Sequence, residues 1–254
     1  MSNIYISLTS IFNNQSELLK TLISVKNQTE QPSKCYIYLS EEKYLLDNGF
    51  KNREITNNNL KKYIEKNNSL FEIKWVRNIG PYRKLLPLLK EKWNEDCLII
   101  TLDDDTEYTE NLIYNMKKDY EEYNCVINYR GFTLKKENNL FGYNNRDKFT
   151  KNCLCNFFTG KGGVLYHPSF FHKTNELIFN EELFINCCKT TDDVWFNFIR
   201  ICNNISCFID NKKYMHNDNT TKYGLFVNIN SKNEVNSTNM KKCMIILRSL
   251  NYII

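Results

Sequence analysis

An uninterrupted apolar run that ends in three consecutive aspartates constrains the fold of this chain more than any other feature. The run from Cys97 to Leu102 reads CLIITL, without the alternation of a half-exposed strand. A strand of this kind is typical of the centre of a parallel sheet, where helices cover both faces. Asp103, Asp104 and Asp105 follow its carboxyl end, the edge at which open α/β sheets bind ligands. The run therefore predicts an α/β fold with an acidic site at that edge.

Strand and helix patterns alternate on both sides of this run. Apolar residues alternate from Ile4 to Leu8 and recur at helical spacing from Leu18 to Val25, which predicts the opening of a βαβ unit. Further strands are expected at 35–39, 71–76, 125–128, 164–166 and 206–209, and further helices within 51–68 and at 81–93, 111–123, 191–201 and 237–252. Pro87 is expected to kink the helix at 81–93, because a proline inside a helix removes a backbone hydrogen bond.

The last helix and one long segment carry weaker patterns. Residues 135–156 lose periodicity and are rich in Asn and Lys, so we expect a mobile surface excursion that contacts substrate. The helix at 237–252 has an apolar stripe opposite a basic face, which predicts packing on its own core. The stripe comprises Met240, Cys243, Met244, Leu247 and Leu250, and the basic face comprises Lys241, Lys242 and Arg248. Peripheral contact of the basic face with a membrane is the alternative.

Charge and cysteine content argue against several classes of protein. The net charge of +5 favours anionic ligands mildly, but the 34 basic residues never form a run of five or six, so no nucleic-acid partner is expected. The ten cysteines are expected to stay reduced in a cytoplasmic protein without a signal peptide. Neighbours such as Cys187 and Cys188 lack the C-x-x-C spacing of a structural zinc site. No stretch reaches the roughly 18 apolar residues that cross a bilayer.

The acidic strand end predicts a metal site only in its context. Mn²⁺ and Mg²⁺ take oxygen ligands from one or two carboxylates, and phosphate oxygens of a nucleotide complete the shell. An isolated D-x-D pattern more often begins a solvated turn. Phosphatases of the haloacid dehalogenase type also place D-x-D after an apolar strand, but usually after the first strand of the chain. Here at least three strands precede it, and Glu107 stands where their motif has Thr or Val.

Four blocks in order along the chain carry a resemblance to a known family. They are GPYRKLLPLL from Gly80, LIITLDDD from Leu98, TGKGGVLYHP from Thr159 and TDDVWF from Thr191. Together they resemble a bacterial and viral branch of glycosyltransferases of the GT-A fold, related to family 2. The resemblance implies one Rossmann-like GT-A domain over 1–254 with a mixed, mostly parallel central sheet flanked by helices. It also implies a nucleotide-binding half at 1–130 and an acceptor-binding half at 131–254.

The resemblance further implies a set of metal ligands. Asp105 is expected to bind Mn²⁺ or Mg²⁺, and Asp103 to contact the metal or the ribose. His216 is expected to complete the metal shell, with a plain loop histidine as the alternative. Asp104 is grouped with the nucleotide-binding residues, but it is expected to point away from its neighbours because successive strand residues alternate faces.

A second set is expected to contact the nucleotide sugar. It comprises Thr9, Glu41, Arg77, Arg83, Lys84, Asp103, Asp104, Gly162 and Gly163. Arg77, Arg83 and Lys84 flank the turn after the third strand, where positive charge can meet a diphosphate, and Lys84 is the first choice among them. Their alternative is solvation at the surface. Glycines in the block from Gly160 lack a Cβ and allow a close approach of the donor sugar, or they form an ordinary turn.

Two acids at the start of a helix complete the predicted site. Asp192 and Asp193 follow Thr191, the expected N-cap. Acids in a first turn often only match the helix dipole, which is the alternative for Asp192. By resemblance both belong to the catalytic set, and Asp193 is expected to act as the general base that removes the acceptor proton.

The resemblance therefore implies a metal-dependent transferase. It would move a hexosyl or N-acetylhexosaminyl group, from a UDP-sugar for preference, to a hydroxyl of a glycan or lipid-linked acceptor with inversion at the anomeric carbon. A catalytically inactive nucleotide- or glycan-binding relative and a retaining transferase on the same fold are the alternatives.

Overall fold

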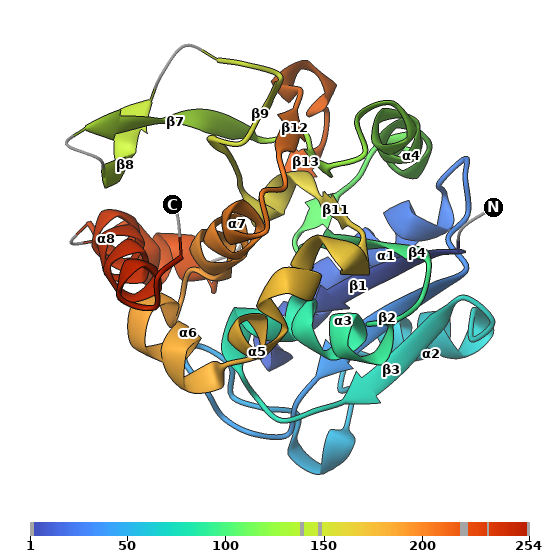
Figure 1. Ribbon diagram of the computed structural model, residues 1–254. Helices are drawn as coiled ribbons and strands as arrows, with labels where there is room; N and C mark the ends of the chain where they lie inside the picture. Colours follow the sequence, from blue (N-terminus) through green and yellow to red (C-terminus); the bar gives the residue numbers. More distant parts are fainter. Residues whose placement is uncertain (1–2, 138–139, 147–148, 219–222, 233, 253–254) are drawn as a thin grey trace.

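Helices on two sides enclose one eight-stranded sheet (Figure 1). The computed structural model describes residues 3–137, 140–146, 149–218, 223–232 and 234–252. The strand order is β3-β2-β1-β4-β11-β6-β12-β9, and β11 runs antiparallel to both of its neighbours. A separate antiparallel sheet has the order β10-β7-β8. The predicted α/β class with a mixed, mostly parallel sheet is confirmed.

The elements have the following bounds. The strands are β1 Asn3–Thr9, β2 Lys34–Leu39, β3 Phe71–Trp75, β4 Cys97–Leu102, β5 Thr106–Glu107, β6 Val126–Asn128, β7 Gly131–Glu137, β8 Leu140–Arg146, β9 Asn152–Cys153, β10 Asn156–Phe158, β11 Val164–Tyr166, β12 Cys207–Ile209 and β13 Asn217–Asp218. The α-helices are α1 Gln15–Lys26, α2 Asn58–Lys66, α3 Leu86–Glu91, α4 Leu112–Tyr123, α5 Asn175–Ile178, α6 Glu181–Cys188, α7 Asp192–Cys202 and α8 Val235–Ser249.

The strand β4 lies at the centre of the sheet and all six of its side chains are buried. Leu98, Ile100 and Leu102 pack into the core that includes residues of α1, α2 and α4. Cys97 and Ile99 belong to the core on the other side of the sheet. Because each fully buried side chain of this size stabilises the fold by about 1.5–3 kcal/mol, the run is held in place from both faces. The prediction of a central strand buried on both faces is confirmed.

The segment expected as one kinked helix is two shorter ones. A 3-10 helix spans Gly80–Lys84, and α3 begins at Leu86 with Pro87 in its first turn. Proline is tolerated there because its missing N–H would have no partner within the helix. Pro87 therefore helps to start a second helix, and the expectation of a kink inside a continuous helix was wrong.

The segment expected as an excursion without regular structure contains strands. Residues 131–158 supply β7, β8 and β10, which pair as an antiparallel sheet. Leu134, Phe141 and Phe157 from this sheet are buried, and the Arg146 guanidinium lies 4.1 Å from the ring centroid of Phe132. These strands are rich in Asn and Lys and gain a buried face only when they pair, so the local pattern did not reveal them.

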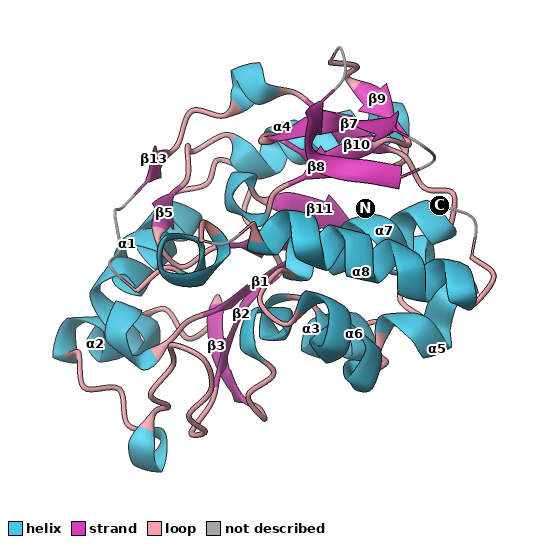
Figure 2. Ribbon diagram, turned by 90° about the vertical axis from the view of Figure 1, so that its left-hand side faces the viewer, coloured by secondary structure: helices cyan, strands magenta, loops and turns pink. Residues whose placement is uncertain are grey.

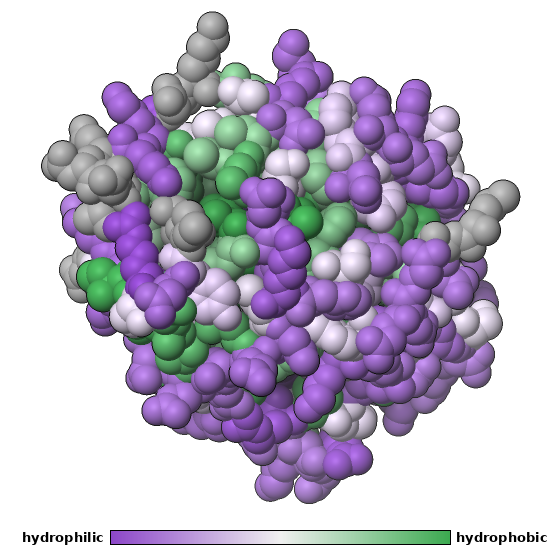
Figure 3. Space-filling view, in the orientation of Figure 1, coloured by the Kyte–Doolittle hydropathy of each residue, from purple (hydrophilic) through white to green (hydrophobic). Residues whose placement is uncertain are grey.

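The C-terminal helix α8 packs on the protein's own core, as expected. Met240, Cys243, Met244 and Leu247 are fully buried, whereas Leu250, beyond the end of the helix, is 45% exposed. Figures 1 and 2 show α8 beside α7 and close to α6 and the small antiparallel sheet. Figure 3 shows apolar side chains gathered in the upper part of one face, while the lower right, over α2 and β3, is almost entirely hydrophilic. None of the described helices is long and apolar enough to span a membrane.

Candidate functional site

A cavity of about 890 Å³ opens at the carboxyl ends of β1 and β4. Thr9 and Ser10 line it from the end of β1, and the aspartates at 103–105 line it from the end of β4. The opposite side is lined by residues of β7 and β8, by the first turn of α7 and by residues 223–230. The structure therefore brings the acidic strand end and the acidic helix start, 87 residues apart in sequence at Asp105 and Asp192, to one cavity.

Lys84 joins these two acidic groups. Its Nζ lies 2.7 Å from Asp103 Oδ1 and 3.6 Å from Asp192 Oδ2. Burial disfavours the charged amine, but the charges of Asp103 and Asp192 outweigh it and hold the pKa of Lys84 well above its usual range. A Cβ on Gly160 would stand 2.6 Å from Lys84 Nζ, so a glycine at position 160 leaves room for this ion pair. Lys84 is thus a positive charge that is held between the end of β4 and the start of α7.

Asp104 also faces the cavity, contrary to expectation. The Ser10 hydroxyl donates a hydrogen bond to its carboxylate, and Asp104 lines the cavity together with its two neighbours. The alternation rule does not apply because β4 ends at Leu102 and the chain turns at once. Burial, with the charges of Asp105 and Asp103, raises the pKa of Asp104 to about 7.

The carboxylates at 103–105 fit a hard divalent cation. Three acidic side chains at one strand end repel one another, and this repulsion adds to burial in raising the pKa of Asp104. Carboxylate oxygens are the ligands that Mg²⁺ and Mn²⁺ take in proteins, commonly one or two per ion. Asp105 is half-buried, lines the cavity and accepts a hydrogen bond from the Thr106 hydroxyl at 3.4 Å. Asp103 also lines the cavity, with its Oδ1 2.7 Å from Lys84 Nζ.

His216 lies beside this group without joining it. Its Nδ1 accepts a hydrogen bond from the Thr109 N–H at 3.2 Å, and its ring packs against Tyr108 and Tyr214 with centroids 4.8 and 4.9 Å away. It does not line the cavity. Among the described residues, Asp103, Asp105 and His216 do not form a group whose donor atoms all lie within 4.8 Å of one another. The expected three-residue metal shell is therefore not assembled in this structure.

Asp193 projects into the cavity from the first turn of α7. Its Oδ1 accepts a hydrogen bond from the Val194 N–H at 2.9 Å. Burial and the charge of Asp192 raise the pKa of Asp193 to about 7, which is near the value that suits a general base at neutral pH. Thr191 occupies the N-cap position as expected, but its side chain makes no capping bond and instead accepts from Asn239 Nδ2 of α8 at 3.0 Å.

Four of the residues predicted to contact the nucleotide sugar lie outside the cavity lining. Glu41 pairs with Arg53 at 2.8 Å between Nε and Oε2, and Arg77 pairs with Glu181, both pairs being largely exposed and outside the cavity lining. A Cβ on Gly162 would meet Arg130, and one on Gly163 would meet Leu102 and Met116. These two glycines therefore pack against protein and do not face the cavity, where Gly160 lies instead.

Arg83 and Thr9 line the cavity but have structural partners. Arg83 is 1% exposed, and its guanidinium lies 2.9 Å from Asp47 Oδ2. The Thr9 hydroxyl donates to the Tyr38 carbonyl oxygen at 2.8 Å. Asp47 thus pairs with one nitrogen of the Arg83 guanidinium, while the buried Nη1 of Arg83 has no hydrogen-bond partner among the described residues.

Sequence reasoning missed most of the opposite wall. Phe132, Tyr143 and Arg146 from β7 and β8 line the cavity with Arg130. Burial, followed by the charge of Asp193, raises the pKa of Tyr143 to about 12. The alternation of Phe141 and Tyr143 was the available signal, but Asn, Lys and other polar residues surround it in the sequence. Asp47, the partner of Arg83, had no periodic signal at all.

Comparison with known proteins supports the fold. No protein-family model and no curated protein matches the sequence. Crystal structures of S. aureus TarS 1–349 match in fold: alone at TM-score 0.54 and 17% identity, with UDP at 0.55 and 16%, and with UDP-GlcNAc at 0.53 and 15%. The matches cover 86%, 86% and 87% of this chain and 60%, 61% and 59% of those chains. The chain thus spans about 60% of their length, and the predicted GT-A fold is confirmed.

Proposed function

We propose that this chain is a glycosyltransferase that uses a UDP-sugar and a divalent cation. The observation that carries the proposal is that Asp105, at the strand end, and Asp193, at the helix start, share one cavity. The first offers a carboxylate to a cation and the second has a pKa suited to a base. The structures similar in fold include complexes with UDP and with UDP-GlcNAc, so UDP-GlcNAc is the first donor to test.

The residues of the cavity divide the work of a single displacement. Asp105, with Asp103, would hold Mn²⁺ or Mg²⁺, and the bound ion would neutralise charge on the departing diphosphate. Lys84 keeps Asp103 and Asp192 in place through its two ion pairs. Asp193 takes the proton of the acceptor hydroxyl as that oxygen forms its bond to the anomeric carbon. The bond from that carbon to the diphosphate breaks, UDP leaves with the bonding pair, and attack from the opposite face inverts the configuration.

The acceptor in this proposal is a hydroxyl of a glycan or of a lipid-linked sugar. Phe132 and Tyr143 give the second wall the aromatic surface that commonly packs against sugar rings, and both line the cavity. The basic residues that line the cavity are not clustered in the sequence, which argues against a nucleic-acid ligand. A cytoplasmic location belongs to the same proposal.

A thermal-shift experiment tests the donor and metal together. The chain is heated with UDP, UDP-GlcNAc, UDP-glucose or GDP-mannose, with and without Mn²⁺. A ligand that binds only the folded state stabilises it by about 2.7 kcal/mol at 100 times its Kd, so a uridine nucleotide should raise the Tm only when Mn²⁺ is present.

Two variants make this test specific. Asp105→Asn should lose the Mn²⁺-dependent shift, while Glu110→Gln, which removes one exposed carboxylate outside the cavity lining, should keep it. A native chain that shows no metal-dependent nucleotide shift would sink the proposal. Transfer with retained anomeric configuration, measured by NMR of the product, would overturn the single displacement but not the donor assignment.

A further inference from the structure

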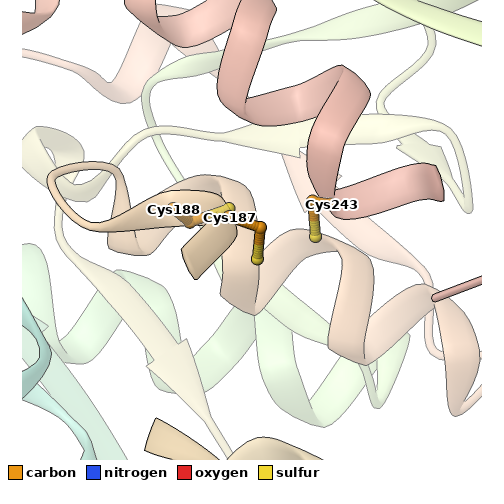
Figure 4. Close-up of side chains that lie close together, drawn as sticks. All are labelled: Cys187, Cys188 and Cys243. Carbon is orange, nitrogen blue, oxygen red and sulfur yellow. The ribbon is translucent and has the colours of Figure 1, made fainter. Parts of the chain in front are cut away.

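Three buried cysteines meet where α6 and α8 pack together, outside the cavity lining. Cys187 and Cys188 end α6, and Cys243 lies on the facing side of α8 (Figure 4). Their sulfur atoms all lie within 4.8 Å of one another, and each residue is at most 1% exposed. Three thiols at this spacing are the geometric requirement for a shared metal ion.

The three sulfurs carry thiol protons that a bound cation would replace. Cys187 Sγ donates a hydrogen bond to the Leu183 carbonyl oxygen at 3.1 Å, and Cys188 Sγ donates to the Asn239 carbonyl oxygen at 3.9 Å. A cation placed between the sulfurs would take the place of these protons, because the thiolate is the form in which cysteine binds metals.

We propose that Cys187, Cys188 and Cys243 form a three-sulfur site for a soft, thiophilic metal ion, with Cu(I) as the best fit. Thiolate ligands select soft ions, and structural zinc is almost always bound by four ligands. Among the described residues, no His, Asp or Glu joins the trio within the same 4.8 Å, so a zinc shell would lack its fourth protein ligand. The site does not depend on the proposed transferase function.

The spacing agrees with the size of such a site. Metal–sulfur bonds are about 2.3 Å long, so three sulfurs around one ion in a plane lie about 4 Å apart. The trio, with separations of no more than 4.8 Å, reaches that arrangement through small side-chain adjustments and no movement of α6 relative to α8. Binding would release the thiol protons to solvent.

An ion at this site would also fix the start of α7. Cys188 precedes Asp192 by four residues, and its carbonyl oxygen accepts a hydrogen bond from the Tyr82 hydroxyl at 2.8 Å. Thr191 in the intervening segment accepts from Asn239 of α8. Holding α6 to α8 through sulfur therefore holds the segment that presents Asp193 to the cavity.

A Cu(I) titration under anaerobic, reducing conditions tests the site. The native chain competes with bathocuproine disulfonate for Cu(I), and X-ray absorption reports the number of sulfurs around the ion. The expected result is one Cu(I) per chain with three sulfur neighbours. Cys187→Ser and Cys243→Ala should each weaken Cu(I) binding by at least 100-fold, while Cys202→Ser, which removes a half-buried thiol of α7 outside the trio, should not.

Far-UV circular dichroism confirms that each variant is folded before titration, and the absorption measurement on the native chain needs no variant. Uptake that is equal in all variants would place the ion elsewhere and overturn the proposal. Absence of stoichiometric Cu(I) binding by the native chain would show that the thiols serve only as small buried hydrophobic groups. Stoichiometric binding of Zn²⁺ but not Cu(I) would likewise overturn the three-sulfur assignment, since zinc demands a fourth ligand.

Discussion

Two sheets border the same cavity and contribute opposite chemistry to it. The parallel strand β4 ends in the acidic group at 103–105 beside the end of β1, whereas β7 and β8 supply Phe132, Tyr143 and Arg146. The acidic wall suits a cation and a diphosphate, and the aromatic and basic wall suits an acceptor. This asymmetry is why we propose a nucleotide-binding half at 1–130 and an acceptor-binding half at 131–254. Lys84, paired with both Asp103 and Asp192, links the acidic wall to the first turn of α7.

Asp193 lines the cavity from the first turn of α7, and its removal should have the largest effect. Asp193→Asn keeps the shape of the side chain but cannot accept the acceptor proton, so kcat should fall roughly 10²–10⁴-fold, the usual contribution of a general base. Binding of the UDP-sugar, measured by calorimetry, should stay within about twofold because the acidic wall is intact. Normal turnover by this variant would show that Asp193 is not the general base.

The buried ion pair between Arg83 and Asp47 should stabilise the protein next to the acidic wall. Removing one partner of a buried pair leaves an uncompensated charge and costs about 3–5 kcal/mol, so Asp47→Asn should lower the free energy of unfolding by that amount in a urea titration. Glu41→Gln breaks an exposed pair with Arg53 and should cost no more than about 1 kcal/mol. Equal losses in the two variants would contradict the structural role of Arg83.

The pH dependence of transfer tests the role of Asp193 as the general base independently of any substitution. Burial and Asp192 raise the pKa of Asp193 to about 7, and a base must be deprotonated to act. The kcat/KM should therefore rise with pH up to about 7 and level off above it, and at pH 5 about 1% of the base is ionised, which gives a loss of about 100-fold. A profile that is flat from pH 5 to 8 would argue against Asp193 as base, whatever the effect of its substitution.

The aromatic wall should control the acceptor and not the donor. Tyr143 packs edge-on against Phe132 and Phe157, with centroids 5.5 and 5.7 Å away, so it is held rigidly at the cavity. Loss of a central aromatic contact costs about 2 kcal/mol, so Tyr143→Ala should raise the acceptor KM by about 30-fold and leave the donor KM unchanged. Tyr143→Phe keeps the packing and should lose less. Tyr114→Ala, an exposed tyrosine of α4, is the control.

The acidic wall could be predicted from the sequence and the aromatic wall could not, for a physical reason. The run from Cys97 to Leu102 is buried on both faces, so its apolar character is visible within six residues. In β7 and β8 only part of each strand is buried, and Phe132 finds its partner Phe157 25 residues away. Propensity reports local preference, while the pairing of distant strands is decided by what they bury together. The same limit concealed the partner of Arg83.

Substitution of His216 should have the smallest effect of these variants, and it tests whether the metal site includes a residue from the second half of the chain. Its imidazole packs on Tyr108, whose hydroxyl accepts a hydrogen bond from the Asp103 N–H at 2.9 Å, so His216 acts on the acidic wall through Tyr108. Outer-shell partners of a metal site typically contribute about 10–100-fold to affinity. Because His216 lies outside the cavity lining, His216→Ala should weaken Mn²⁺ binding in the presence of UDP by less than about 10-fold in a calorimetric titration. A larger loss, matching that of Asp105→Asn, would mean that the His216 imidazole reaches the ion and completes the metal shell. The second half of the chain would then supply a metal ligand, and the nucleotide-binding residues would not all lie within residues 1–130.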